Sequence, residues 1–277
     1  MKDLGDLKYF LGIHITRNRQ DRQLAIDQTT YVQMLLEKFE MEDCNPVSTP
    51  FAIGTKLHQA SYDDVLVDQK EYQSIIGSLM YAMLCTRPDL AYAVSQLSQF
   101  NSKPTSKHYA ATKHVLRYLK STSNLGITYG RNAMVLEGYS DADWGSNDGR
   151  KSISGYVFML CGGAISWQSK KQPTVALSTT EAEYIALVQT TKESIWIQRL
   201  FIELGRTAED HKVIYGDNQG SIALASNPQY HARTKHVDIQ YHFIRECVET
   251  GHIQLEYCPT KDMIADELIK ALVKSRH

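Results

Sequence analysis

The chain has 277 residues, with 30 Lys and Arg against 31 Asp and Glu, a formal net charge of -1, and 43% hydrophobic and 22% charged residues. This composition is typical of a globular protein, so it excludes a chain that is disordered throughout. The balance of charges also excludes a nucleic-acid-binding surface that covers the whole protein, although it is compatible with a local basic stripe.

Neither membrane segments nor cysteine motifs are encoded. No stretch reaches the roughly 18 uncharged apolar residues of a membrane span, and the first ten residues, MKDLGDLKYF, lack the apolar run of a signal peptide. We therefore expect an intracellular protein without a membrane partner. The five cysteines are odd in number and form no CxxC pair, so we expect reduced thiols rather than a disulfide framework or a zinc site.

The first half of the chain predicts a hairpin followed by helices. Apolar and polar residues alternate over residues 7–28 on both sides of a polar tip, as in a β-hairpin. Helical spacing of apolar residues then predicts helices over 30–40, 72–84, 89–100 and 104–120, with Pro104 as the first residue of the last helix.

The second half has a different pattern. Strand-like runs cover 135–139, 154–160 and 164–168, and a long helix is expected over 178–204. Further strands follow at 212–215 and 253–257, and helices are expected from 217, over 236–249 and over 262–273. This order predicts an α/β domain with a mixed five-stranded sheet and helices on its faces.

Acidic residues fall where these strands end or helices begin: Asp141, Glu181 or Glu183, Asp217 and Asp266. Carboxylate oxygens are the ligands that Mg²⁺ prefers, and two such ions can hold the attacking and leaving oxygens of a phosphodiester. The alternative for each acid alone is a helix cap or a solvated surface charge, which is the commoner role.

Several strings resemble the RNase H domain of copia-type retrotransposon Pol polyproteins: GYSDADWG (138–145), KSISGYVF (151–158), AISWQSKKQP (164–173), STTEAEYIAL (178–187), DNQGSI (217–222), RTKHVDIQYHFIRE (233–246) and PTKDMIAD (259–266). The resemblance implies an RNase H-like fold and a domain over residues 125–277. It also implies that this domain hydrolyses the RNA strand of an RNA/DNA hybrid with two Mg²⁺ ions, for which Mn²⁺ is a possible substitute.

The first half resembles the end of the reverse transcriptase in the same polyproteins, through DLGDLKYFLGI (3–13), PVSTP (46–50), YQSIIGSLMY (72–81), TRPDLAY (86–92) and LRYLK (116–120). Residues 1–124 would then form thumb- and connection-like helices. The family's polymerase aspartates belong to a Tyr-x-Asp-Asp motif, which Tyr62-Asp63-Asp64 does not match because it lacks the spacer residue. We expect these three residues to be solvated surface and the chain alone to lack polymerase activity.

The resemblance also assigns the four acids. Asp141, in Ser-Asp-Ala-Asp, corresponds to the first catalytic Asp, whereas Asp143 is expected past the strand end. Asp217 and Asp266 correspond to the third and fourth acids. Side chains two residues apart on a helix point about 200° apart, so only one of Glu181 and Glu183 faces the sheet. We favour Glu183, because the family pattern has a small residue three positions later, where this chain has an alanine.

Basic residues are the expected substrate contacts. Lys113, Arg117 and Lys120 recur along one flank of a predicted helix, and Lys170 and Lys171 end a strand, so all five suit phosphate binding. Ordinary solvated side chains are an equally common role for each residue alone. The tryptophans at 144, 167 and 196 are expected in the core rather than stacked on bases.

The partners expected from the resemblance are an RNA/DNA hybrid and the remainder of the Pol polyprotein, including the polymerase palm. Two alternatives stay open: an inactive or domesticated remnant that binds nucleic acid without cutting it, and a metal-dependent nuclease or transposase of the same fold that acts on DNA. The compartment, a cytoplasmic virus-like particle or the nucleus, is open as well.

Overall fold

The computed structural model describes residues 5–130, 134–145, 149–206, 213–226 and 235–277. These residues form two compact units, one of Met1–Arg131 with Ala271–His277 and one of Asn132–Lys270. The strand β4 (Gly126–Tyr129), which follows the expected boundary at residue 125, pairs with β3 (Gln23–Asp27) inside the first unit. No helix in the described ranges is long and apolar enough to cross a membrane.

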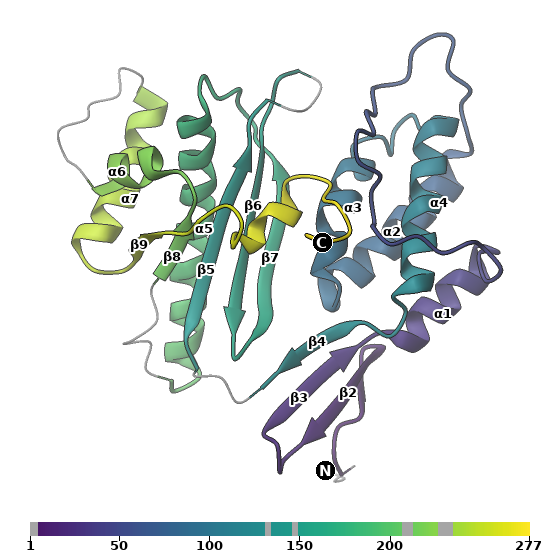
Figure 1. Ribbon diagram of the computed structural model, residues 1–277, viewed down its shortest axis with the longest axis horizontal. Coiled ribbons are helices and arrows are strands. Elements are labelled where there is room, and N and C mark those ends of the chain that lie inside the picture. Colours follow the sequence, from purple (N-terminus) through teal and green to yellow (C-terminus); the bar gives the residue numbers. More distant parts are fainter. Residues whose placement is uncertain (1–4, 131–133, 146–148, 207–212, 227–234) are drawn as a thin grey trace. The chain divides into compact units, whose positions relative to one another are not determined.

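The sheet of the first unit is antiparallel, in the order β1-β2-β3-β4 (Figure 1). The expected hairpin is present as β2 (Ile13–Asn18) and β3, which meet at the pair Asn18 and Gln23. Strand β1 (Tyr9–Phe10) pairs with the outer side of β2. The chain returns to this sheet through β4 only after the helices.

The helices of the first unit are α1 (Thr29–Lys38), α2 (Gln69–Cys85), the short 3-10 helix η1 (Pro88–Leu90), α3 (Ala91–Ser98) and α4 (Ser106–Ser121). Their apolar faces form one core. The expected start of the last helix at Pro104 is wrong by two residues. Thr105 caps α4 instead. Its side chain accepts from the His108 backbone N–H, and the His108 side chain accepts from the Thr105 backbone N–H.

A buried arginine links this unit internally. Arg87 Nη2 lies 2.7 Å from Asp89 Oδ2, and Arg87 Nη1 donates to the Thr122 carbonyl at 2.9 Å. Tyr118 donates its hydroxyl to the same Asp89 carboxylate at 2.8 Å. Arg87 is 1% exposed, and a buried guanidinium group without its partner would destabilise the fold. The Arg87–Asp89 ion pair therefore gives the TRPDLAY string a structural role. Tyr62, in contrast, is fully exposed, as expected.

The second unit has the predicted mixed five-stranded sheet, which confirms the RNase H-like fold class. The strand order is β7-β6-β5-β8-β9 (Figure 1). Strands β5 (Leu136–Asp143), β6 (Ile153–Leu160) and β7 (Gly163–Lys171) are antiparallel neighbours, whereas β8 (Val213–Gly216) and β9 (Gln254–Tyr257) continue the sheet in parallel from β5. The flanking helices are α5 (Thr179–Glu203), α6 (Gln219–Ser226) and α7 (Lys235–Glu249), and α5 packs on β5.

Two expectations for this unit are wrong. Strand β5 runs through Asp143, so Asp141 and Asp143 both lie within the strand. The helix expected over 262–273 is only the 3-10 helix η2 (Ile264–Leu268), with backbone bonds three residues apart, such as Ile269 N to Asp266 O. Packing against β6 fixes this segment, and this contact outweighs its helical pattern.

Two of the three tryptophans also differ from expectation, whereas Trp167 is half-buried. Trp144 is 50% exposed and Trp196 is 58% exposed, so neither is a core residue. Trp144 is instead tied down by its indole N–H, which donates to the Ala176 carbonyl at 3.0 Å.

Glycine at position 155 allows η2 to lie on the sheet. A Cβ atom at Gly155 would stand 2.8 Å from Leu268 Cβ and 2.8 Å from Ile269 Cγ2. Gly155 is also the β6 partner of Asp141. The missing side chain therefore sets how closely η2, which carries Asp266, approaches the strand that carries Asp141.

We expect Gly155→Ala to destabilise the protein by about 1–3 kcal/mol, because the new methyl group forces η2 away from β6. Thermal unfolding measures this. The control is Gly77→Ala in α2, where a Cβ would meet nothing within 4 Å, so a gain of about 0.5–1 kcal/mol is expected. Equal effects of the two substitutions would contradict the close approach of η2.

Candidate metal centre

Asp141 lies at the centre of the second sheet, between β6 and β8. Its neighbour Ser140 is directed toward α5, where Thr190 Oγ1 donates to Ser140 Oγ at 2.9 Å. Because side chains alternate along a strand, the Asp141 side chain starts on the face of its partner Gly155, and its carboxylate still lies within 4.8 Å of an oxygen of Glu183. Asp141 is 3% exposed; its Oδ1 accepts from the Ala142 backbone N–H at 2.8 Å. Its Oδ2 is buried and has no hydrogen-bond partner among the described residues.

The first turns of α5 separate the roles of the two glutamates. Ser178 caps the helix by accepting from the Glu181 N–H at 3.1 Å, and the Glu181 carboxylate accepts from the Leu177 N–H at 2.7 Å. The Glu181 side chain therefore helps to cap the N-terminus of α5. Glu183 is 7% exposed and extends from the buried side of α5, between the small buried residues Ala182 and Ala186.

Asp217 follows β8 directly, and the register explains where it lies. Gly216 pairs with Ser140 in the neighbouring parallel strand, so Asp217, directly after the end of β8, comes to lie beside Asp141 within β5. Thr260 Oγ1 donates to Asp217 Oδ2 at 2.8 Å. The cap of α6 is supplied by Asn218, whose Oδ1 accepts from the Ser221 N–H at 2.9 Å. Asp217 is therefore not needed as a helix cap.

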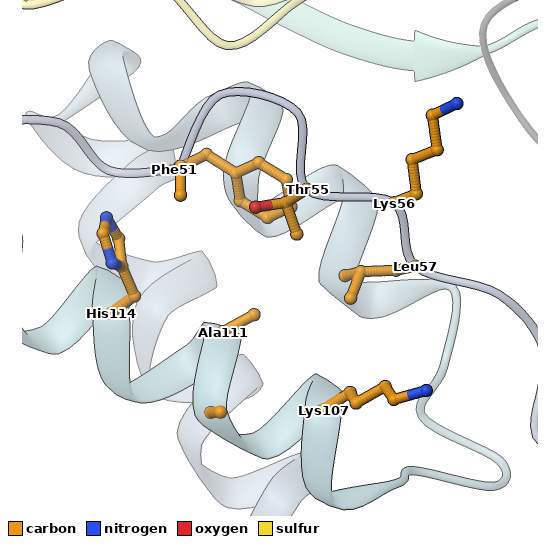
Figure 2. Close-up of a pocket in the computed structure, with 9 residues that line it drawn as sticks. Phe51, Thr55, Lys56, Leu57, Lys107, Ala111 and His114 are labelled. Atoms are coloured by element: carbon orange, nitrogen blue, oxygen red, sulfur yellow. The ribbon is translucent and has the colours of Figure 1, made fainter.

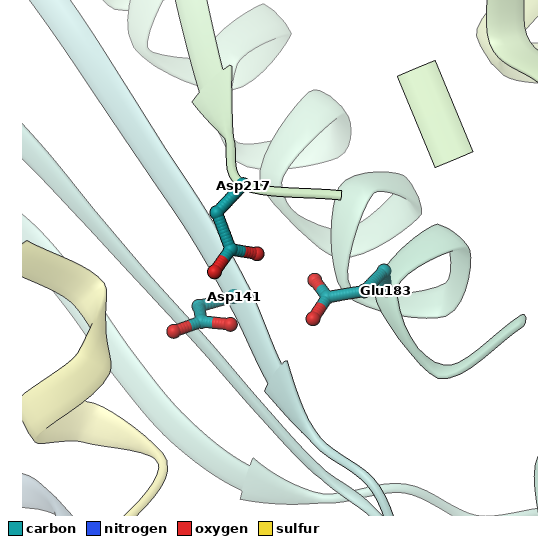
Figure 3. Close-up of side chains that lie close together, drawn as sticks. All are labelled: Asp141, Glu183 and Asp217. Carbon is teal, nitrogen blue, oxygen red and sulfur yellow. The ribbon is translucent and has the colours of Figure 1, made fainter. Parts of the chain in front are cut away.

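These three acids form one cluster. Each of Asp141, Glu183 and Asp217 offers a carboxylate oxygen, and these oxygens all lie within 4.8 Å of one another. Figure 3 shows the three side chains directed toward a common point from a strand, a helix and a strand end. Three elements that are far apart in the sequence thus place three acidic groups in one small space.

The fourth predicted acid, Asp266, is 1% exposed on η2. It lies next to Asp141, where the two side chains interact. Its Oδ1 is 2.5 Å from Lys270 Nζ, four residues later. The structure therefore brings all four predicted acids to one region of the second unit.

Burial is the main cause that raises the pKa of Asp141 well above its ordinary value, and the neighbouring Asp266 and Asp217 add to it. Burial likewise raises the pKa of Glu183, followed by the charges of Asp141 and Asp217. Carboxyl groups this close cannot all ionise without a compensating cation. A divalent metal ion fits this donor set of hard oxygens, and Asp141 Oδ2 supplies a buried acceptor that such an ion would satisfy.

The predicted phosphate-binding residues have different surroundings. Arg117 Nε donates to the Asn45 carbonyl at 2.6 Å, and Lys120 Nζ donates to the Cys44 carbonyl at 2.8 Å, so both side chains hold a loop of the first unit. Lys113 is exposed, with its ammonium group 4.9 Å from the centre of the Tyr109 ring. Lys170 is exposed and Lys171 half-buried at the end of β7.

Two residues near the cluster escaped the sequence analysis, Thr260 and Lys270. Thr260 is distant in sequence from Asp217 and carries no local signal. Lys270 stands at the i+4 position from Asp266, a spacing that could have indicated an ion pair.

A separate cavity of about 430 Å³ lies in the first unit. Figure 2 shows it between α4 and the segment that contains Phe51 and Leu57. His114, on its wall, is engaged with the Thr49 carbonyl at 3.0 Å. None of the predicted site residues lines this cavity.

Comparisons with known proteins match the whole chain. The chain is 45% identical over 282 residues to the retrovirus-related Pol polyprotein from transposon TNT 1-94 of Nicotiana tabacum, which covers 100% of the chain and 21% of that protein. It is 43% identical over 277 residues to the retrovirus-related Pol polyprotein from transposon RE1 of Arabidopsis thaliana, with 99% and 19% covered. The chain therefore spans about a fifth of the length of these relatives.

Among solved structures, that of LC11-RNase H1 in complex with an RNA/DNA hybrid is similar, with 17% identity and a TM-score of 0.37, over 48% of this chain and 93% of that chain. No family model matches the chain.

We expect the metal-free protein to lose stability as the pH rises above about 4, since Asp141 and Glu183 keep protons in the folded state that the unfolded chain releases there. In EDTA, Glu183→Gln should flatten this decline and raise the Tm at pH 8. Glu181→Gln, the control, keeps an oxygen that can accept from the Leu177 N–H, so it should cost about 0.3–1 kcal/mol from the lost charge at the helix N-terminus and leave the pH dependence unchanged. A wild-type pH dependence in Glu183→Gln would show that Glu183 does not titrate within the cluster.

Proposed function

The chain belongs to the copia-type retrotransposon Pol polyproteins, and from this we propose that its second unit is a divalent-metal-dependent ribonuclease that hydrolyses the RNA strand of an RNA/DNA hybrid. One observation carries the proposal: carboxylate oxygens of the buried Asp141 and Glu183 and of the half-buried Asp217 converge within 4.8 Å, with Asp266 next to Asp141. Such a set of acids is costly to bury unless it has a ligand.

The four acids would bind the metal ions. Asp141, on the central strand of the sheet, would be a ligand for the metal ions. Glu183, Asp217 and Asp266 would be further ligands, with Asp217 held in orientation by Thr260. Two Mg²⁺ ions, or Mn²⁺ in their place, would supply an activated water and stabilisation of the leaving 3′ oxygen.

The hybrid is the proposed substrate because the relatives are retrovirus-related Pol polyproteins. We expect the protein to recognise the shape of the hybrid and the ribose 2′-OH groups rather than the base sequence. We propose residues 1–124 as the C-terminal part of a reverse transcriptase and residues 125–277 as the ribonuclease domain, with the remainder of Pol, including the palm, as partner.

Of the five basic residues proposed to contact phosphates, Lys113 and Lys170 are exposed and suit the role best. Lys171 follows at the same strand end. Arg117 and Lys120 would contact phosphates only with donors left over from their bonds to the Asn45 and Cys44 carbonyls.

Asp217→Asn should reduce hybrid cleavage about a thousandfold, because one metal-holding charge is lost, and leave hybrid affinity within a factor of about three. The assay compares matched RNA/DNA, RNA/RNA and DNA/DNA duplexes in Mg²⁺, and the wild type should cut only the RNA strand of the hybrid. Asp262→Asn, an exposed acid, is the control and should cut normally. Binding without cleavage by the wild type would favour the inactive remnant, and cleavage of DNA duplexes would favour the DNA nuclease.

The two glutamates give a second test. Glu183→Gln should lose cleavage that added Mg²⁺ does not restore, because its carboxylate is in the cluster, whereas Glu181→Gln should retain most activity. Initial cleavage rates across a Mg²⁺ titration measure the difference. The opposite ranking of the two variants would refute the assignment of Glu183.

A further inference from the structure

A lysine lies at the edge of the carboxylate cluster. The Nζ atom of Lys270 is 2.5 Å from Asp266 Oδ1, and the two side chains are 40% and 2% exposed. The charge of Lys270 also acts on Asp141 and Asp143. A half-buried ammonium group therefore faces the same carboxyl groups that the proposed metal ions would bind.

We infer that Lys270 is a positioning residue that serves as a resident cation: its ammonium group compensates the charge of the Asp266 carboxylate when no metal is bound, and it competes with a divalent cation for that carboxylate. The inference rests on the proposed metal binding at this cluster. It adds a residue that controls how readily metal enters.

The backbone fixes the carboxylate for which Lys270 and the metal ion compete. Gly155 allows η2 to lie directly on β6, so Asp266 is held beside Asp141 by packing and its carboxylate has little freedom to move away. Lys270 reaches the same carboxylate along a partly exposed stem. The Lys270 side chain can therefore move out toward solvent when a metal ion binds, whereas Asp266 keeps its place.

Two opposite consequences follow from this arrangement. Removal of the ammonium group leaves a buried carboxylate without its cation, which destabilises the metal-free fold. The same removal makes the cluster more negative and frees Asp266, which strengthens the attraction for a divalent cation. A purely structural ion pair would produce only the first effect, so the combination identifies the role.

The test uses the full chain with Lys270→Met, which retains much of the stem but not the charge, and Lys270→Arg, which retains the charge. Lys192→Met, an exposed lysine on α5, is the matched control. Thermal unfolding in EDTA gives the metal-free stability, and calorimetric titration with Mn²⁺ in the absence of nucleic acid gives the dissociation constant.

We expect Lys270→Met to lower the Tm in EDTA by several degrees and to tighten Mn²⁺ binding about tenfold. Lys270→Arg and Lys192→Met should resemble the wild type in both measurements. The double variant Asp266→Asn with Lys270→Met should recover most of the lost Tm, because no uncompensated carboxylate is left.

Unchanged or weaker Mn²⁺ binding by Lys270→Met, or a loss of Tm that Asp266→Asn does not recover, would overturn the inference. Failure of the proposed function has a different signature. A wild-type chain that binds Mn²⁺ and shows the Lys270 effects, but does not cut the hybrid, would refute the ribonuclease and leave the resident cation standing. Absence of Mn²⁺ binding in every variant would refute both.

Discussion

Mutual repulsion among carboxyl groups, two of them buried, is the constraint on which the site of the second unit depends. Three different elements hold oxygens of Asp141, Glu183 and Asp217 within 4.8 Å of one another. The β5 and β8 register fixes Asp141 beside Asp217, and the Ser178 cap fixes the first turns of α5. Asp141 Oδ2 is buried and has no hydrogen-bond partner among the described residues, and a divalent cation would give this oxygen a partner.

Much of the fold can be predicted from local pattern. Alternation located the five strands of the second sheet, and helical spacing located α1, α2, α4, α5 and α7 to within a few residues. The spacing of Glu181 and Glu183 on a helix was enough to expect opposite directions, and the structure places only Glu183 in the cluster. These features are local, because they depend on periodicity within a single element.

The remaining features depend on contacts between distant segments, which no window of sequence contains. The pattern of residues 262–273 is helical, yet packing on Gly155 reduces it to η2. Thr260 orients Asp217 across 43 positions. Arg117 and Lys120 have the spacing of a phosphate-binding flank, but both reach loop carbonyls more than 70 positions earlier in the chain. Tryptophan is a residue type expected in the core, but Trp144 and Trp196 are exposed at the surface.

The central claim is that the four acids hold divalent metal, and the location of the metal tests it most directly. Anomalous diffraction from crystals grown with Mn²⁺ should show density within ligand distance of Asp141, Glu183 and Asp217. Crystals of the Asp217→Asn variant should lose or weaken that density. Well-ordered carboxylates without anomalous density between them, at a Mn²⁺ concentration that supports hybrid cleavage, would contradict the account.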